Sequence, residues 1–116
     1  MKRILIVDDD AFILESTKKT LEPFFEVDTS TSCSGALELA QNKTYYGLIT
    51  DVDFGGGMNG LELISRIRTI QKELFIMVVS GIHYSDAVRQ QTVELGASFT
   101  ERPLTLEFVR RIMEVN

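Results

Sequence analysis

The sequence lacks features that are typical of several protein classes: paired cysteines, a basic stripe and long apolar runs. Its single cysteine, Cys33, excludes an internal disulfide and fits a reducing cytoplasm. No basic stripe runs through a chain with 12 basic and 17 acidic side chains and a net charge of −5, so nucleic acid is not an expected partner. Apolar runs last only a few residues, which excludes membrane insertion, and acids follow the first run too soon for a signal peptide. We therefore expect a soluble cytoplasmic protein.

The length and the composition are those of one folded domain. A chain of 116 residues with 44% hydrophobic residues can bury a core, and no linker, repeat or low-complexity segment divides it. We expect a single domain over residues 1–116. Cys33 has an ordinary interpretation in such a domain, as a small residue in the core or at the start of a helix.

Short apolar runs alternate with segments of helical spacing. Unbroken apolar runs are typical of strands covered on both faces, and residues three or four apart form the buried stripe of a helix. Capping residues support the predicted helices: Asp10, Asn59 with Glu62 and Ser85 each stand at a helix start, and Gly96 follows a helix end. The predicted strands lie near residues 4–7, 25–27, 46–50, 74–79 and 97–100, and the helical stripes include Leu14 and Leu21, Ala36 and Ala40, Leu63 and Ile67, Val88 and Leu95, and Val109 and Met113.

Five repeats of strand and helix predict an α/β fold. Such a pattern gives a five-stranded parallel sheet with right-handed crossovers and helices on both faces, the doubly wound (βα)5 arrangement. Ligands of doubly wound sheets bind at the carboxyl ends of the strands, near the point where the strand order reverses. The residues that follow the strands are therefore the candidate site.

Acidic residues follow two of these strands. The stretch "ILIVDDD" ends the first apolar run with Asp8 and Asp9, and Asp51 follows the third run. If the strands are neighbours, three carboxylates share a small volume, where they repel one another unless a cation lies between them. Carboxylates and water are the ligands that Mg²⁺ prefers, so we expect a Mg²⁺ site here. Asp10 is interpreted as a helix cap.

The remaining strand ends supply groups that suit a phosphoryl group. Ser80 offers a hydroxyl, Gly81 a backbone N–H and Arg102 a positive charge. A cation and such donors around one carboxylate would neutralise charge on a transferring phosphoryl group. Asp51 is then the candidate nucleophile, which would form an acyl phosphate.

The same segments resemble a known family. "ILIVDDD", "LITDVDFGGGMNGLELI", "IMVVSG" and "ERPLTLEFV" occur in the order and at the spacing of a response-regulator receiver domain, the phosphoacceptor module of two-component signalling. The resemblance extends from Lys2 to about Val115. It implies a flavodoxin-like, CheY-like fold and a domain that takes a phosphoryl group from a phosphohistidine of a kinase or phosphotransfer protein, and then hydrolyses it slowly.

The resemblance also implies roles for individual residues. Asp51 would be phosphorylated, and Asp9 and Asp51 would bind Mg²⁺ directly, with Asp8 acting through water. The backbone carbonyl of Asp53 would be a further ligand. The remaining implied roles are a hydroxyl switch at Ser80, an aromatic switch at Phe99, and a cis peptide bond between Arg102 and Pro103 that would aim the basic side chain at the site. The output surface would combine the fourth helix, the fifth strand and the fifth helix.

Three departures from the family pattern leave other functions open: Arg102, the loop after Asp51, and the negative side chain that Asp53 adds beside the site. Arg102 stands where the family has lysine, and arginine is bulkier, planar and bidentate. The loop after Asp51 lacks the usual proline and is one residue longer. A degenerate receiver that binds partners independently of phosphorylation is therefore the alternative, and partner binding unchanged in Asp51→Ala would identify it. The Asp-x-Asp pattern of Asp51 and Asp53 also occurs in phosphatases of the haloacid-dehalogenase type. Against this alternative, Asp51 follows the third strand, the chain is short and the later acidic pair of that motif is missing.

Overall fold

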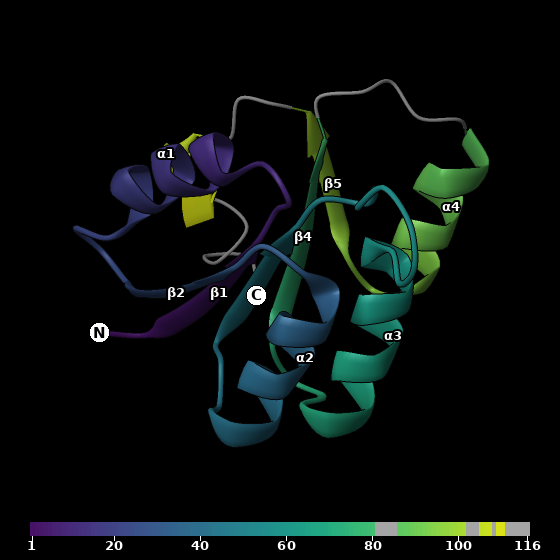
Figure 1. Cartoon of the computed structure of the whole chain (residues 1–116), viewed down its shortest axis with the longest axis horizontal. Helices are drawn as coiled ribbons and strands as arrows, with labels where there is room; N and C mark the ends of the chain where they lie inside the picture. Colours follow the sequence, from purple (N-terminus) through teal and green to yellow (C-terminus); the bar gives the residue numbers. More distant parts are fainter. Residues whose placement is uncertain (81–85, 102–104, 108, 111–116) are drawn as a thin grey trace.

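The chain forms one five-stranded parallel sheet with helices on both faces, as the computed structural model shows (Figure 1). The strand order is β2-β1-β3-β4-β5, so the predicted fold class is confirmed. The elements are β1 (Arg3–Val7), α1 (Ala11–Leu21), β2 (Glu26–Ser30), α2 (Cys33–Asn42), β3 (Gly47–Thr50), α3 (Gly60–Ile70), β4 (Phe75–Ser80), α4 (Asp86–Glu94) and β5 (Ser98–Glu101).

The structure describes residues 1–80, 86–101, 105–107 and 109–110, and it describes Ser80 without its side chain. Within the predicted fifth helix, residues 106–107 and 109–110 are helical, and Val109 is fully buried. The predicted stripe residue Met113 lies outside the described residues. Among the described helices, none is long and apolar enough to cross a membrane.

The two faces of the sheet carry separate cores, which explains the unbroken apolar runs. Successive side chains of a strand point to opposite faces. In β1, Leu5 and Val7 pack with α2 and α3, whereas Ile4 and Ile6 pack with Leu14 and other residues of the α1 side. β3 and β4 alternate in the same way. The middle of each inner strand is therefore apolar on both faces.

Local signals fix the starts of α1 and α3 as predicted, whereas the predicted cap Ser85 lies outside the described residues. The Asp10 side chain caps α1 by accepting bonds from Phe12 N at 2.9 Å and Ile13 N at 3.3 Å. Asn59 caps α3 by accepting a bond from Glu62 N at 2.9 Å. Gly96 follows α4 with a φ of 72°, a conformation that favours glycine. The Asp10 and Asn59 caps satisfy backbone N–H groups at the helix starts that would otherwise have no partner.

Cys33 is the first residue of α2 and is buried in the core, as its ordinary interpretation predicted. Burial, together with the nearby charges of Glu62 and Asp9, raises the pKa of its thiol to about 11. The thiol therefore stays protonated at neutral pH and acts as a small apolar residue.

The second strand lies further along the chain than its apolar signal suggested. The run at residues 25–27 is followed by polar residues, yet β2 extends from Glu26 to Ser30. It lies at the edge of the sheet, beside β1 only, where polar side chains remain solvated. Asp28 connects this edge strand to the rest of the domain. Its carboxylate accepts a 2.7 Å bond from the Tyr45 hydroxyl and pairs with Lys43 at 3.3 Å and Arg3 at 3.4 Å.

Tyr45→Phe should destabilise the protein at neutral pH and have little effect in acid. Burial alone would raise the pKa of Asp28, but the bond from Tyr45 and the charges of Lys43 and Arg3 bring it below its usual value. A lowered pKa gives stability that is present above the unfolded pKa, near 4, and is lost as the pH falls through the folded pKa. We expect a loss of about 1 kcal/mol at pH 7, measured by urea unfolding, that shrinks towards pH 3. An equal loss at both pH values would contradict this account.

Tyr46→Phe is the matched control. The Tyr46 ring lies 3.9 Å from the Lys2 ammonium and packs edge-on against Phe75, and both contacts involve the ring, which phenylalanine keeps. Its unfolding free energy should change much less than that of Tyr45→Phe.

Candidate phosphoryl and metal site

The strand register brings the predicted acidic residues together. β1 and β3 are parallel neighbours in which Val7 pairs with Thr50, so Asp8 and Asp51 leave the sheet side by side. A bond of 3.2 Å from Asp51 N to Val7 O extends the ladder into the site. The chain passes from β1 to β2 on one side and to β3 on the other, so the acids lie where the strand order reverses.

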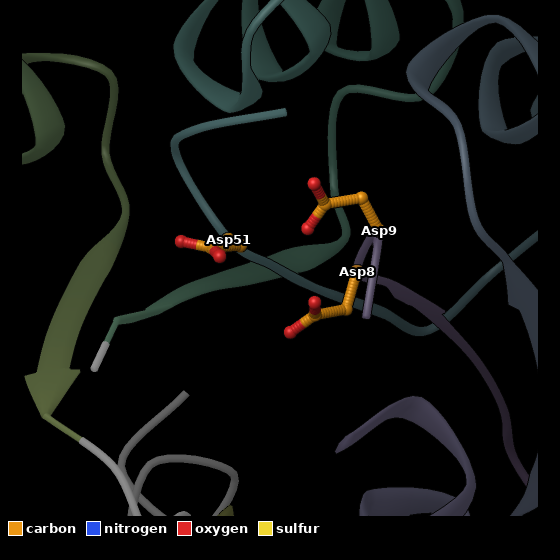
Figure 2. A group of neighbouring side chains, drawn as sticks. All are labelled: Asp8, Asp9 and Asp51. Atoms are coloured by element: carbon orange, nitrogen blue, oxygen red, sulfur yellow. The ribbon is translucent and has the colours of Figure 1, made fainter. Parts of the chain in front are cut away.

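The three carboxylates gather in a small space and extend toward the same side of the strand ends (Figure 2). One oxygen of each of Asp8, Asp9 and Asp51 lies within 4.8 Å of the others. Asp8 is 6% exposed and accepts a bond from Asp10 N at 2.9 Å, whereas Asp51 is half-buried and accepts a bond from Val52 N at 2.7 Å. Asp9 is exposed. The site therefore has a fixed inner wall and an open outer side.

This donor set fits a hard divalent cation. All three groups offer anionic oxygens, which Mg²⁺ and Ca²⁺ prefer, and their separation matches ligands of a single ion. A cavity of about 250 Å³ adjoins Asp8 and Asp51 and continues along α1 past Phe12 and Ser16. This cavity and the exposed Asp9 leave the cluster open to an ion.

The turn from β3 to α3 is packed closely against the site. Gly60, the first residue of α3, is buried and donates a 2.7 Å bond to Val52 O. A Cβ atom at this position would overlap the carbonyl oxygen of Asp51. The Thr50 hydroxyl also donates to Asp51 O, at 2.9 Å. The backbone of Asp51 is thus held from two directions.

The loop after Asp51 folds on itself. The Asp53 carboxylate accepts a 3.0 Å bond from Gly55 N and is exposed, so it is not part of the three-carboxylate group. Gly55, Gly56 and Gly57 all have positive φ, and no neighbouring atom lies within 4 Å of where their Cβ atoms would be. These glycines are required by the backbone conformation rather than by crowding.

Other predicted site residues are only partly described. Phe99 lies on β5, half-buried against the α2–α3 core. The backbone of Ser80 ends β4, at the same edge of the sheet as the acids, but its side chain is not described. Gly81, Arg102 and Pro103 lie outside the described residues.

Two contacts near the site had no counterpart in the sequence patterns. One is the bond from Thr50 to the carbonyl of Asp51, for which the only signal is a hydroxyl residue directly before an acid at a strand end. The other joins Arg89 of α4 to β5: its guanidinium carbon lies 4.6 Å from the centre of the Phe99 ring, and its Nη2 lies 3.2 Å from Glu101 Oε1. No periodicity links residues on different elements in this way.

Comparison with known proteins identifies the family. Residues 4–103 match the response regulator receiver domain family. The chain therefore belongs to that family, and it is a receiver domain of the kind found in two-component response regulators.

Individual relatives agree with this assignment. A response regulator receiver domain protein (CheY-like) from Methanospirillum hungatei is 28% identical, with a TM-score of 0.89 and coverage of 99% of this chain and 93% of that one. A response regulator protein from Burkholderia pseudomallei, solved with a phosphorylated aspartic acid and a calcium ion, is 26% identical with a TM-score of 0.85, over 94% of this chain and 64% of that one.

A curated relative is longer. The C4-dicarboxylate transport transcriptional regulatory protein DctD of Pseudomonas aeruginosa is 25% identical over 97% of this chain. The chain spans only 25% of that protein's length. The likeness therefore concerns about a quarter of that protein.

Proposed function

We propose that Asp51 is the phosphoacceptor of this receiver domain and takes its phosphoryl group from a phosphohistidine of a histidine kinase or phosphotransfer protein. The observation that carries the proposal is the convergence of Asp8, Asp9 and Asp51 within 4.8 Å of one another at the end of the sheet. Three carboxylates repel one another there, and a bound cation is the usual compensation. The same arrangement favours phosphorylation over a module that binds partners independently of it.

The transfer exchanges one bond to phosphorus for another. A carboxylate oxygen of Asp51 attacks the phosphorus of the phosphohistidine, the P–N bond breaks, and the imidazole leaves with the electron pair. Asp51 is suited to this role because Val52 N and the packed backbone at Gly60 fix its orientation while its carboxylate is only half-buried. Attack of water on the phosphorus later restores the carboxylate and releases phosphate.

Asp8, Asp9, Asp51 and the backbone carbonyl of Asp53 would hold a Mg²⁺ ion. A bound Mg²⁺ ion supplies positive charge that offsets the negative charge of the carboxylates and of the transferring phosphoryl oxygens. The chain contributes a preformed set of oxygens, of which Asp8 is already held by the N–H of Asp10. We extend the proposal to Ser80, Gly81 and Arg102 as phosphoryl-binding groups, because Ser80 ends β4, Gly81 follows it and Arg102 follows β5.

Asp9→Asn should weaken Mg²⁺ binding by about tenfold or more, because it removes one anionic ligand without changing the size of the side chain. Isothermal titration with Mg²⁺ measures the affinity. Asp10→Asn is the matched control, since asparagine also caps helices and Asp10 lies outside the three-carboxylate group. Equal affinities of the two variants would contradict the ligand assignment.

Incubation with Mg²⁺ and a small-molecule phosphodonor such as acetyl phosphate tests the proposal itself. We expect one phosphoryl group per chain by intact mass, released in base as an acyl phosphate is, and no incorporation when EDTA replaces Mg²⁺. A chain that stays unmodified at saturating donor and Mg²⁺ would rule out the phosphoacceptor function.

A further inference from the structure

One side chain of α4 holds two residues of β5 at once. The Arg89 guanidinium covers the Phe99 ring at 4.6 Å and pairs with Glu101 at 3.2 Å. Phe99 and Glu101 are two residues apart, so their side chains leave the same face of the strand. Figure 1 shows α4 beside β5 at the edge of the sheet, where this bridge lies.

The strand positions that Arg89 holds lie opposite the end of β4. In the parallel register, Phe99 pairs with Val78 and Glu101 pairs with Ser80, the last residue of β4. Ser80 is the hydroxyl residue proposed to meet the phosphoryl group. A contact that fixes Phe99 and Glu101 therefore acts on the part of the sheet next to the site.

The Phe99 ring lies between the core and a cation. One side packs against the α2–α3 core, and Arg89 lies over the ring. The Arg89 side chain is 37% exposed and that of Glu101 is 59% exposed, so the ion pair alone is weak. The ion pair does, however, hold the guanidinium in place over the ring, where the partly desolvated cation–π contact is the larger contribution.

We propose that Arg89 acts as a latch, a contact that keeps the Phe99 ring at the α4–β5 surface and opposes its movement into the sheet. The latch rests on the proposed function, because it regulates the response of the same site. Inward movement of the ring breaks the cation–π contact. Phosphorylation of Asp51 must therefore supply the free energy of this lost contact before the α4–β5 surface changes. Arg89 is thus a positioning residue that sets how strongly the α4–β5 surface is biased towards its unphosphorylated form.

The orientation of Phe99 in the unmodified protein tests the latch without any phosphoryl group. With ¹³C-labelled phenylalanine, NMR couplings should show one χ1 rotamer for Phe99 in the wild type and averaging between rotamers in Arg89→Gln. Arg66→Gln is the matched control, because it removes the same charge and another exposed helical ion pair, that with Glu62. Identical Phe99 rotamers in wild type and Arg89→Gln would overturn the proposal.

The affinity for a phosphoryl mimic tests the regulatory consequence. With Mg²⁺ present, Arg89→Gln should bind beryllofluoride about three- to tenfold more tightly than the wild type, because loss of the contact removes the bias against the active form. Glu101→Gln, which removes the ion pair but leaves a guanidinium that can still contact the ring, should show a smaller gain. Unchanged affinity in Arg89→Gln would overturn the latch. If the wild type binds no beryllofluoride, the proposed function fails, whereas the rotamer measurement still decides whether Arg89 holds Phe99.

Discussion

Asp51→Asn should lower phosphoryl incorporation to background, a loss of about 100-fold or more. Asparagine has nearly the same size, and its amide oxygen can still accept the bond from Val52 N that orients the side chain. The fold should therefore remain, while the nucleophilic carboxylate is gone. Incorporation is measured by intact mass after incubation with acetyl phosphate and Mg²⁺.

Two further variants separate loss of the nucleophile from loss of the metal. In Asp9→Asn, a higher Mg²⁺ concentration should restore incorporation, because only a ligand is missing. In Asp51→Asn it should not. Asp86→Asn, in the first turn of α4, removes the same charge outside the three-carboxylate group and should leave incorporation unchanged. Wild-type incorporation in Asp51→Asn would place the acceptor elsewhere in the chain.

Gly60→Ala should destabilise the protein by at least about 2 kcal/mol and lower its melting temperature by roughly 10 °C. The added Cβ would overlap the carbonyl oxygen of Asp51 and lie 3.0 Å from Val52 Cα, and neither backbone group can rotate away as a side chain could. The helix and the strand end must separate, which also moves Asp51. We therefore expect weaker Mg²⁺ binding together with the loss of stability, measured by thermal unfolding and by titration.

Gly35→Ala is the control for this substitution. Gly35 is also near the start of a helix, in α2, but a Cβ there would meet side-chain hydroxyls, those of Ser30 and Ser32, rather than backbone atoms. These hydroxyls can shift, at the cost of weakening the capping bond from Gly35 N to Ser32 Oγ. Alanine also suits a helix interior better than glycine. The melting temperature of Gly35→Ala should stay within a few degrees of the wild type, and an equal loss in both variants would contradict the role of close packing at Gly60.

The sequence is sufficient to predict the convergence of the acids, because that convergence follows from topology. Asp8 and Asp51 each follow an apolar strand, and the carboxyl ends of parallel strands meet at one edge of a sheet. Helix starts are equally local: Asp10 and Asn59 cap their helices through bonds to backbone N–H groups two or three residues away. These features depend on near neighbours in the chain or on the order of the elements.

Other features depend on contacts that no local pattern encodes. β2 is an edge strand with polar residues, and its network at Asp28 is completed by Tyr45, 17 positions away. The contact of Arg89 with Glu101 spans 12 positions and joins a helix to a strand. Single-sequence periodicity describes which face of an element is apolar, but it cannot pair polar side chains across elements. Such pairs become visible only once the helices are placed on the sheet.

Mn²⁺ in place of Mg²⁺ tests the shared cation site most directly, because its unpaired electrons broaden the NMR signals of nearby nuclei. At substoichiometric Mn²⁺, we predict that the amide signals of Asp8, Asp9, Asp51 and Val52 broaden together, and that excess Mg²⁺ restores them together. Broadening that begins elsewhere on the surface, or that affects the β1 and β3 ends at different Mn²⁺ concentrations, would contradict a single ion held between the two strands.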